Sequence, residues 1–163
     1  MLHFYLPGEE TPLPVAHGPE GRPVEVLTYD DKNETLQQAV MAILHRLIEE
    51  EHIPASAIAV LTPSSQRTSL LKTDSLRSPQ EITLRWSDQD AGTNQVRLET
   101  IYRFKGLERP VVILAEIERR LAQERSSVDG QRLLYVACSR AQHHLIVLLP
   151  KRVPVQLSRL FGP

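Results

Sequence analysis

The sequence is poor in cysteine and has no long hydrophobic run. Cys138 is the only cysteine among the 163 residues, which excludes an internal disulfide and a cysteine-rich zinc site and is typical of a reducing compartment. The longest apolar run, Leu145 to Leu149, is far too short to span a membrane, and the N-terminus lacks the basic and then apolar pattern of a secretory signal. We therefore expect a cytoplasmic protein with no membrane partner.

The sequence also lacks an excess of either charge. It has 19 lysines and arginines against 20 aspartates and glutamates, a formal net charge of −1, so any contact with nucleic acid must come from a local basic cluster. Adjacent His143 and His144 point to different sides of a strand or helix, and no metal site is expected from them.

A phosphate-binding loop is missing as well. No segment matches G-x-x-x-x-G-K-[ST], so the chain is not expected to hydrolyse ATP by itself. The turn after the first predicted strand, YDDKNE, contains no glycine, which argues against a metabolic enzyme built on a dinucleotide-binding sheet.

Residues 1–23 are rich in proline and glycine and are predicted to be a linker or lead segment before a compact domain over residues 24–163. In that domain, apolar and alternating runs predict strands, and apolar stripes with a 3.6-residue period predict helices. Strands are expected at 24–29, 58–61, 82–86, 96–101, 111–116 and 144–149, and helices from residue 33, from the turn at 62–65 through Leu71, and over 129–142. The alternation predicts an α/β fold with a mostly parallel sheet and helices on both faces.

The segment ETIYRFKGLERPVV, residues 99–112, places a basic and aromatic turn between two predicted strands. Gly106 permits a close backbone approach, Arg103 and Lys105 can donate to phosphate oxygens, and Tyr102 offers a ring for base stacking. The same residues also fit an ordinary loop in which Phe104 packs into the core and the charged side chains are solvated. The segment alone does not separate these alternatives.

The segment QRLLYVACSRA, residues 131–141, precedes the last predicted strand and is expected to carry Arg140 on a helix. A guanidinium stays charged and forms a planar fork that matches a phosphoryl group. A surface salt bridge is the simpler role for Arg140 taken alone, and Cys138 is interpreted as a small packing residue.

Taken in order, TIYRFKGLE, VVILAE, QRLLYVACSRA and HLIVLL closely resemble helicase motifs V and VI of the UvrD, Rep and PcrA group of superfamily 1. Upstream, IAVLTPSSQR resembles motif IV, so the resemblance covers nearly the whole chain after residue 23. It implies a second RecA-like motor domain, with a three-layer α/β/α P-loop NTPase-like fold that lacks the phosphate loop. In this group the domain closes on a first RecA-like domain, and ATP with magnesium binds in the cleft between them.

The resemblance also implies which residues face the nucleotide. Arg140 corresponds to the motif VI arginine that reaches the γ-phosphate, and Glu108 to the motif V glutamate that meets the nucleotide sugar, with Gly106 allowing the close turn. Arg67 corresponds to the motif IV arginine, although TPSSQR departs from the usual spacing. Arg140 and Arg67 are therefore the predicted catalytic residues.

Single-stranded nucleic acid crosses the tops of both motor domains in this group, and the resemblance implies contacts to it from Thr100 and Tyr102, with Arg103 and Lys105 beside them. Tyr102 stands where the group usually has histidine, and Ser139 where it usually has threonine. Many relatives insert a large helical subdomain between motifs IV and V, which the short stretch between Arg67 and Thr100 cannot hold.

Two hypotheses follow from these residues. The first is an excised or separately encoded half of an ATP-dependent helicase that contacts single-stranded DNA, with RNA not excluded, and that works with a first RecA-like domain. The alternative is a stand-alone, non-catalytic module derived from a helicase that binds nucleic acid or protein.

Overall fold

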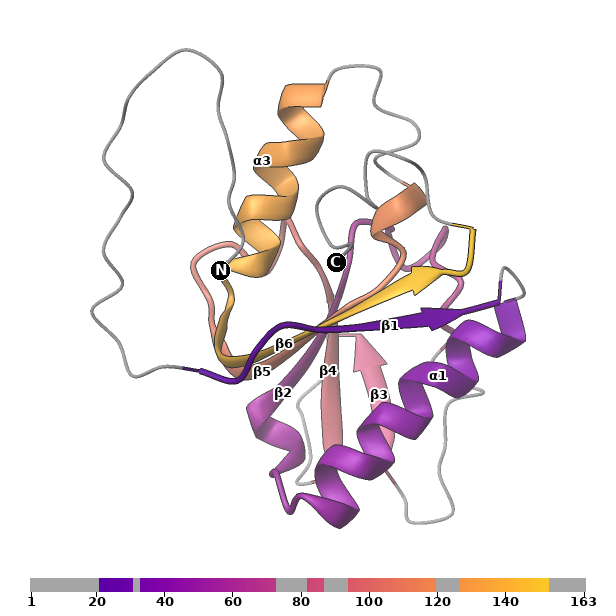
Figure 1. Ribbon diagram of the computed structural model, residues 1–163, viewed down its shortest axis with the longest axis vertical. Coiled ribbons are helices and arrows are strands. Elements are labelled where there is room, and N and C mark those ends of the chain that lie inside the picture. Colours follow the sequence, from indigo (N-terminus) through magenta and orange to yellow (C-terminus); the bar gives the residue numbers. More distant parts are fainter. Residues whose placement is uncertain (1–20, 31–32, 73–81, 87–93, 120–126, 153–163) are drawn as a thin grey trace.

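The computed structural model describes residues 21–30, 33–72, 82–86, 94–119 and 127–152. Six strands form one sheet in the order β1-β6-β5-β2-β4-β3, and all neighbouring strands are parallel (Figure 1). The strands are β1 (Glu25–Tyr29), β2 (Ile58–Thr62), β3 (Thr83–Trp86), β4 (Gln95–Thr100), β5 (Arg109–Leu114) and β6 (Ala141–Pro150). The helices are α1 (Asn33–His45), continued by a π-helical turn over Arg46–Glu50, and α3 (Ser127–Cys138), and a 3₁₀ turn covers Ala55–Ala57.

Because all strands run the same way, the sheet has an amino end, where the strands begin, and a carboxyl end, where they stop. In parallel α/β sheets the connections at these two ends carry the polar residues, while the strands between them are buried by helices on both faces. The two ends therefore define where functional side chains can gather.

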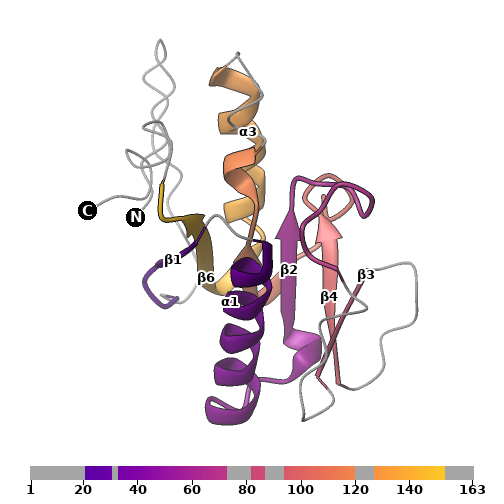
Figure 2. The same cartoon turned by 90° about the vertical axis from the view of Figure 1, so that its right-hand side faces the viewer.

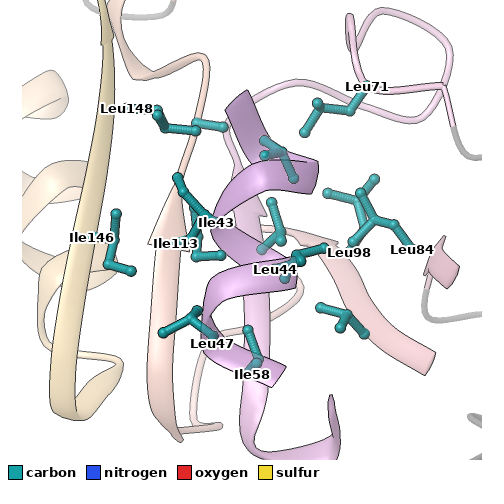
Figure 3. Close-up of a cluster of buried hydrophobic side chains, with 14 of the residues drawn as sticks. Ile43, Leu44, Leu47, Ile58, Leu71, Leu84, Leu98, Ile113, Ile146 and Leu148 are labelled. Carbon is teal, nitrogen blue, oxygen red and sulfur yellow. The ribbon is translucent and has the colours of Figure 1, made fainter. Parts of the chain in front are cut away.

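One core lies between the sheet and α1. The apolar stripe predicted for this helix packs against the sheet: Leu36, Val40, Ile43, Leu44 and Leu47 are buried, and Ile48 is partly buried. Figure 3 shows Ile43, Leu44 and Leu47 packed among strand residues from Leu84 on one side to Ile146 and Leu148 on the other. Strand β2 is buried on both faces, because Ile58 and Val60 join this core while Ala59 and Leu61 join the core on the opposite face.

The second core lies on the opposite face, between the sheet and α3. Leu134 and Ala137 of the helix pack with Val112, Leu114 and further apolar residues of β2 and β6. The architecture is thus a helix, a parallel sheet and a helix in three layers, as the sequence predicts. No helix in the described part of the chain is long and apolar enough to cross a membrane.

The predicted helix from residues 62–65 through Leu71 is wrong. Residues 63–70 form a turn, in which the amides of Thr68 and Ser69 donate to the carbonyl of Ser65 at 3.0 and 2.8 Å. The reason is local: Ser65 and Thr68 hydrogen-bond to each other through side chains and backbone, and such bonds compete with a helix.

The end of the last helix also differs from the prediction. Helix α3 ends at Cys138, so Arg140 lies in the turn between α3 and β6 and not on a helix as predicted. Most of the predicted linker over residues 1–23 lies outside the described residues. At its end, the amide of Arg22 donates to the carbonyl of His143 at 2.7 Å, so the chain already contacts the domain there.

Candidate functional site

The turn before β6 fixes the guanidinium of Arg140 at the amino end of the sheet. Its Nε donates to the carbonyl of Val136 at 3.0 Å, its Nη1 to the carbonyl of Leu107 at 3.3 Å and its Nη2 to the hydroxyl of Ser139 at 2.9 Å. The acceptors come from the last turn of α3 and from the loop before β5, two separate elements of the fold. Arg140 is therefore a positioned cation, and its unused donor directions remain open to an anion.

The loop before β5 meets the turn before β6 through three hydrogen bonds. The amide of Arg109 donates to the carbonyl of Arg140 at 3.0 Å, and Nε2 of Gln142 donates to Oε2 of Glu108 at 3.2 Å. The third is the bond from Arg140 to the carbonyl of Leu107. Glu108 and Arg140, both predicted to face a nucleotide, are thus brought to the same end of the sheet.

Gly106 makes this arrangement possible. Its φ is +83°, in the left-handed region that L side chains rarely adopt, and a Cβ built on it would have no heavy atom within 4 Å. The glycine is required by the backbone turn and also leaves open space beside the backbone. That space is what a closely approaching ligand needs.

The turn over residues 101–106 presents the predicted nucleic-acid residues. The hydroxyl of Thr100 accepts a hydrogen bond from the amide of Arg103 at 3.2 Å, and Phe104 is fully buried in the α3 core and anchors the turn. Tyr102 is 56% exposed and Lys105 is also exposed. An exposed ring and exposed cations on an anchored turn match what a single strand requires, stacking platforms beside phosphate contacts.

The structure does not bring Arg67 to Arg140. Arg67 is exposed in the turn after β2, at the carboxyl end of the sheet, whereas Arg140 precedes β6 at the amino end. Strand β5, which runs between the two ends, is about 17 Å long at a rise of 3.3 Å per residue. The predicted catalytic pair is therefore split between the two ends of the sheet.

A buried carboxylate that the sequence reasoning missed holds the turn of Arg67. Glu116, fully buried just after β5, accepts hydrogen bonds from the hydroxyl of Thr62 at 2.7 Å, the hydroxyl of Ser69 at 2.6 Å and the amide of Leu70 at 2.7 Å. Arg119 donates to the same carboxylate at 2.9 Å and to the carbonyl of Thr68 at 2.9 Å.

Glu116 has a φ of +60°, a strained conformation for a residue with a side chain. The signal in the sequence is an acidic residue directly after the apolar run VVILA, where a buried strand has just ended. A charged side chain that follows such a run without a turn residue needs buried partners.

Cys138, His143 and His144 differ in their degree of burial. Burial raises the pKa of the Cys138 thiol to about 12, which suits the predicted packing role. His144 is buried with Nε2 3.3 Å from the carboxylate of Glu25, while His143 is exposed. No group of three or more histidine, cysteine, aspartate or glutamate side chains among the described residues has the arrangement of a metal site.

The comparisons with known proteins agree with this architecture. Residues 95–148, which contain β4, β5, α3 and most of β6, match the family of UvrD-like helicase C-terminal domains. A search of the curated proteins finds no match.

Among solved structures, the chain is similar to the C-terminal domain of a possible DNA helicase from Lactobacillus plantarum WCFS1, with a TM-score of 0.65 and 23% sequence identity. The match covers 86% of this chain and 81% of that one. At this identity it establishes the shared RecA-like α/β fold and not a shared activity.

Proposed function

We propose that this chain, which carries a UvrD-like helicase C-terminal domain, is the second motor domain of an ATP-dependent DNA helicase or translocase. The observation that carries the proposal is the meeting of Glu108, Gly106 and Arg140 at the amino end of the sheet through the hydrogen bonds of Leu107, Arg109 and Gln142. The loop before β5 and the turn before β6, which are far apart in the sequence, meet there.

Arg140 supplies the chemistry that this domain contributes to ATP hydrolysis. A fixed guanidinium that approaches the γ-phosphate stabilises the charge that develops on the transferring phosphoryl group. Its anchoring on the carbonyls of Val136 and Leu107 limits the entropy lost when it engages a phosphate. Gly106 and Glu108 flank Leu107, whose carbonyl accepts a hydrogen bond from Arg140, and we assign them to the sugar of the same nucleotide.

The ATP site is incomplete in this chain. The sequence contains no loop of the type that cradles nucleotide phosphates and no serine or threonine in the position that binds magnesium in such a loop. A first RecA-like domain must supply both, and ATP with magnesium binds between the two domains. Arg67 lies at the other end of the sheet, so we assign the cation toward the nucleotide to Arg140 alone.

Single-stranded DNA is the proposed partner of the turn over residues 101–106. Tyr102 provides the exposed ring, and Thr100, Arg103 and Lys105 surround it with a hydroxyl and two cations. RNA offers the same phosphates and bases, so the turn itself does not discriminate between the two nucleic acids.

The test is to mix the chain with a phosphate-loop motor domain from the same genome and measure ATP hydrolysis with and without single-stranded DNA. We expect a DNA-stimulated rate that falls by about 10³-fold or more in Arg140→Ala. Arg140→Lys keeps the charge and loses the fork, so it should restore only part of the rate. Arg152→Ala, an exposed arginine after β6, is the matched control and should leave the rate unchanged.

Two outcomes would contradict the proposal. Sustained ATP hydrolysis by the pure chain, abolished by mutation within it, would show that no first domain is needed. A DNA-stimulated rate that is unaffected by Arg140→Ala would remove Arg140 from the site. Binding of single-stranded DNA without ATP hydrolysis in any mixture would support the non-catalytic module instead.

A further inference from the structure

The start of β6 does not pair regularly with β5. Arg109 pairs with Ala141, and Val111, two residues later, pairs with a residue three positions after Ala141. Pro110, which lies between the two β5 residues, has no amide hydrogen to donate to the ladder. β6 therefore contains one extra residue between Ala141 and His144. An extra residue of this kind leaves backbone groups of the strand free for other partners and re-aims its side chains.

The two residues in this irregular stretch, Gln142 and His143, contact two different segments. The side chain of Gln142 donates to Glu108 in the loop before β5 at 3.2 Å. The carbonyl of His143 accepts from the amide of Arg22 at 2.7 Å, in the segment that leads into β1. Figures 1 and 2 show β1 and β6 side by side, with the chain entering both strands from the same end of the sheet. The start of β6 is thus held by both segments.

Gly21 allows the segment before β1 to approach β6 closely. A Cβ built on Gly21 would lie 2.5 Å from the carbonyl oxygen of His143 and 3.1 and 3.3 Å from its carbonyl carbon and Cα. All three are backbone atoms, so no side chain can move aside to make room. Gly106 is the glycine with a positive φ in the described chain, so it is the space beside Gly21, and not its backbone conformation, that requires a glycine.

A row of ion pairs holds the same segment. The guanidinium of Arg22 pairs with Glu51, and Glu51 lies 3.6 Å from Nε of Arg46. Arg46 donates two hydrogen bonds of 2.7 Å to Glu25, which lies 3.3 Å from Nε2 of His144. The side chain of Arg22 is 53% exposed, and exposed ion pairs contribute little to the free energy of folding. The backbone contact is therefore the part that fixes the start of β6.

The irregular stretch adjoins the groups assigned to the nucleotide. Arg140 directly precedes β6, and its carbonyl accepts from the amide of Arg109 at 3.0 Å. Glu108 is bonded to Gln142 in the stretch itself. A displacement of the start of β6 would therefore move both Arg140 and Glu108. Misplacement of a catalytic group by about 1 Å can lower a rate by about 10²-fold.

We propose that Gly21 and the backbone amide of Arg22 form a clamp on the start of β6 and are positioning residues for Arg140 and Glu108. The inference rests on the proposed function, because it concerns the same nucleotide site. Neither residue of the clamp touches the nucleotide. The clamp fixes the irregular stretch of β6, and that stretch fixes the groups that face the nucleotide. Residues 21 and 22, which the sequence places in a linker, thus belong to the working part of the domain.

The first test is amide hydrogen exchange in the full chain, resolved by residue with NMR. Gly21→Ala forces the two segments apart, and Arg22→Pro removes the amide donor. In both variants we expect the amide of Arg109 to exchange about 10-fold faster, as for the loss of about one hydrogen bond. Glu51→Gln is the matched control, since it removes the ion pair of Arg22 and keeps the clamp. The amide of Val60 in the core should be unchanged in all three variants.

The second test is ATP hydrolysis in the mixture with a phosphate-loop motor domain and single-stranded DNA. A displaced Arg140 stabilises the transition state less well, so Gly21→Ala should lower kcat by about 10-fold or more. Glu51→Gln should retain kcat. Gln142→Ala frees Glu108 and leaves Arg140 anchored, so it should raise KM for ATP more than it lowers kcat. A purely structural role of the clamp would not divide kcat and KM in this way.

Unchanged exchange at Arg109 in both Gly21→Ala and Arg22→Pro would overturn the clamp. Faster exchange that extends to Val60 would assign the clamp to the stability of the whole domain and would overturn its positioning role. Faster exchange at Arg109 with an unchanged kcat would overturn the link to Arg140. Absence of ATP hydrolysis by the unchanged chain in every mixture would contradict the proposed function, and exchange at Arg109 would then still decide whether the clamp exists.

Discussion

At the amino end of the sheet, Arg140 is held by backbone carbonyls and a hydroxyl, and no carboxylate within the described residues forms an ion pair with it. At the carboxyl end, Glu116 is fully buried and accepts hydrogen bonds from Thr62 at the end of β2, from Ser69 and Leu70 of the turn that follows, and from Arg119. The first arrangement keeps charge accessible to a ligand. The second uses charge to fix the backbone.

This difference assigns the two ends different roles. An accessible cation contributes little to the free energy of folding, because its contacts with the protein replace equally good hydrogen bonds to water. It is, however, available to bind a phosphate. A buried carboxylate with four donors is costly to disturb, because each donor loses its partner in a place that water does not reach. Substitutions at the two ends should therefore separate activity from stability.

The largest expected effect on stability is at Glu116. Glu116→Ala leaves Thr62, Ser69 and the amide of Leu70 without their acceptor, and we expect it to lower the free energy of unfolding by about 3 kcal/mol. Chemical denaturation of the full chain measures this. Arg140→Ala, its counterpart at the amino end, should cost at most about 1 kcal/mol.

A matched variant separates the lost hydrogen bonds from the strained backbone. Glu116→Gly removes the same carboxylate but tolerates the φ of +60°, so it should be about 1 kcal/mol more stable than Glu116→Ala. Equal stability of Glu116→Ala and the unchanged chain would show that the carboxylate does not hold the turn, and the comparison between the two ends would fail.

A smaller effect is expected at Gly106. Gly106→Ala places a Cβ on a backbone with φ of +83°, which costs about 1–2 kcal/mol, while the open space around it adds no clash. We expect the loss of stability to be accompanied by a lower rate of DNA-stimulated ATP hydrolysis, because Glu108 and Leu107 follow the turn directly.

Gly106→Asn is the control for Gly106→Ala, since asparagine adopts positive φ more readily than alanine and should recover part of both losses. A rate that falls equally in both variants while stability recovers in Gly106→Asn would assign Gly106 to ligand approach and not to the turn.

Much of this fold was predictable from the sequence, because the buried strands and α1 are set by patterns of short range. The apolar stripe of α1 and the strands around Val60 and Ile113 lie where periodicity places them. The turn after β2 was predicted wrongly as a helix. Besides the local bonds between Ser65 and Thr68, the turn is fixed by hydrogen bonds from Ser69 and Leu70 to Glu116, which is far away in the sequence. Contacts between residues so far apart in the sequence leave no periodic pattern in it.

The candidate site was predictable in its composition and not in its geometry. The motif resemblance names Arg140, Glu108 and Gly106, and the structure brings them to one end of the sheet. The motif resemblance could not show that Arg67 lies at the other end of the sheet. That position follows from the direction of β2 and β6 within the sheet. The roles of all these residues remain predictions for the kinetic test.

The smallest expected effect concerns His144, a buried polar residue at the amino end. His144 lies 3.3 Å from Glu25, which itself receives two hydrogen bonds of 2.7 Å from Arg46, and Arg22 also lies near this pair. Burial lowers the pKa of His144 and outweighs the attraction of Glu25, which raises it.

Because the pKa of His144 is lowered by folding, the unfolded chain binds more protons than the folded one below about pH 6.5, the ordinary pKa of histidine. Stability contributed by neutral His144 is therefore present above that pH and is lost progressively as the pH falls below it. Glu25, whose pKa Arg46 lowers through its hydrogen bonds, loses its contribution only at lower pH, below the ordinary value of 4.5.

Denaturation midpoints of the unchanged chain measured between pH 7.5 and about pH 5 should decline, and His144→Gln should flatten that decline. Exposed His143 is the matched control, and His143→Gln should leave the pH dependence as it is. An equally steep decline in His144→Gln would show that the pH dependence of stability does not come from His144.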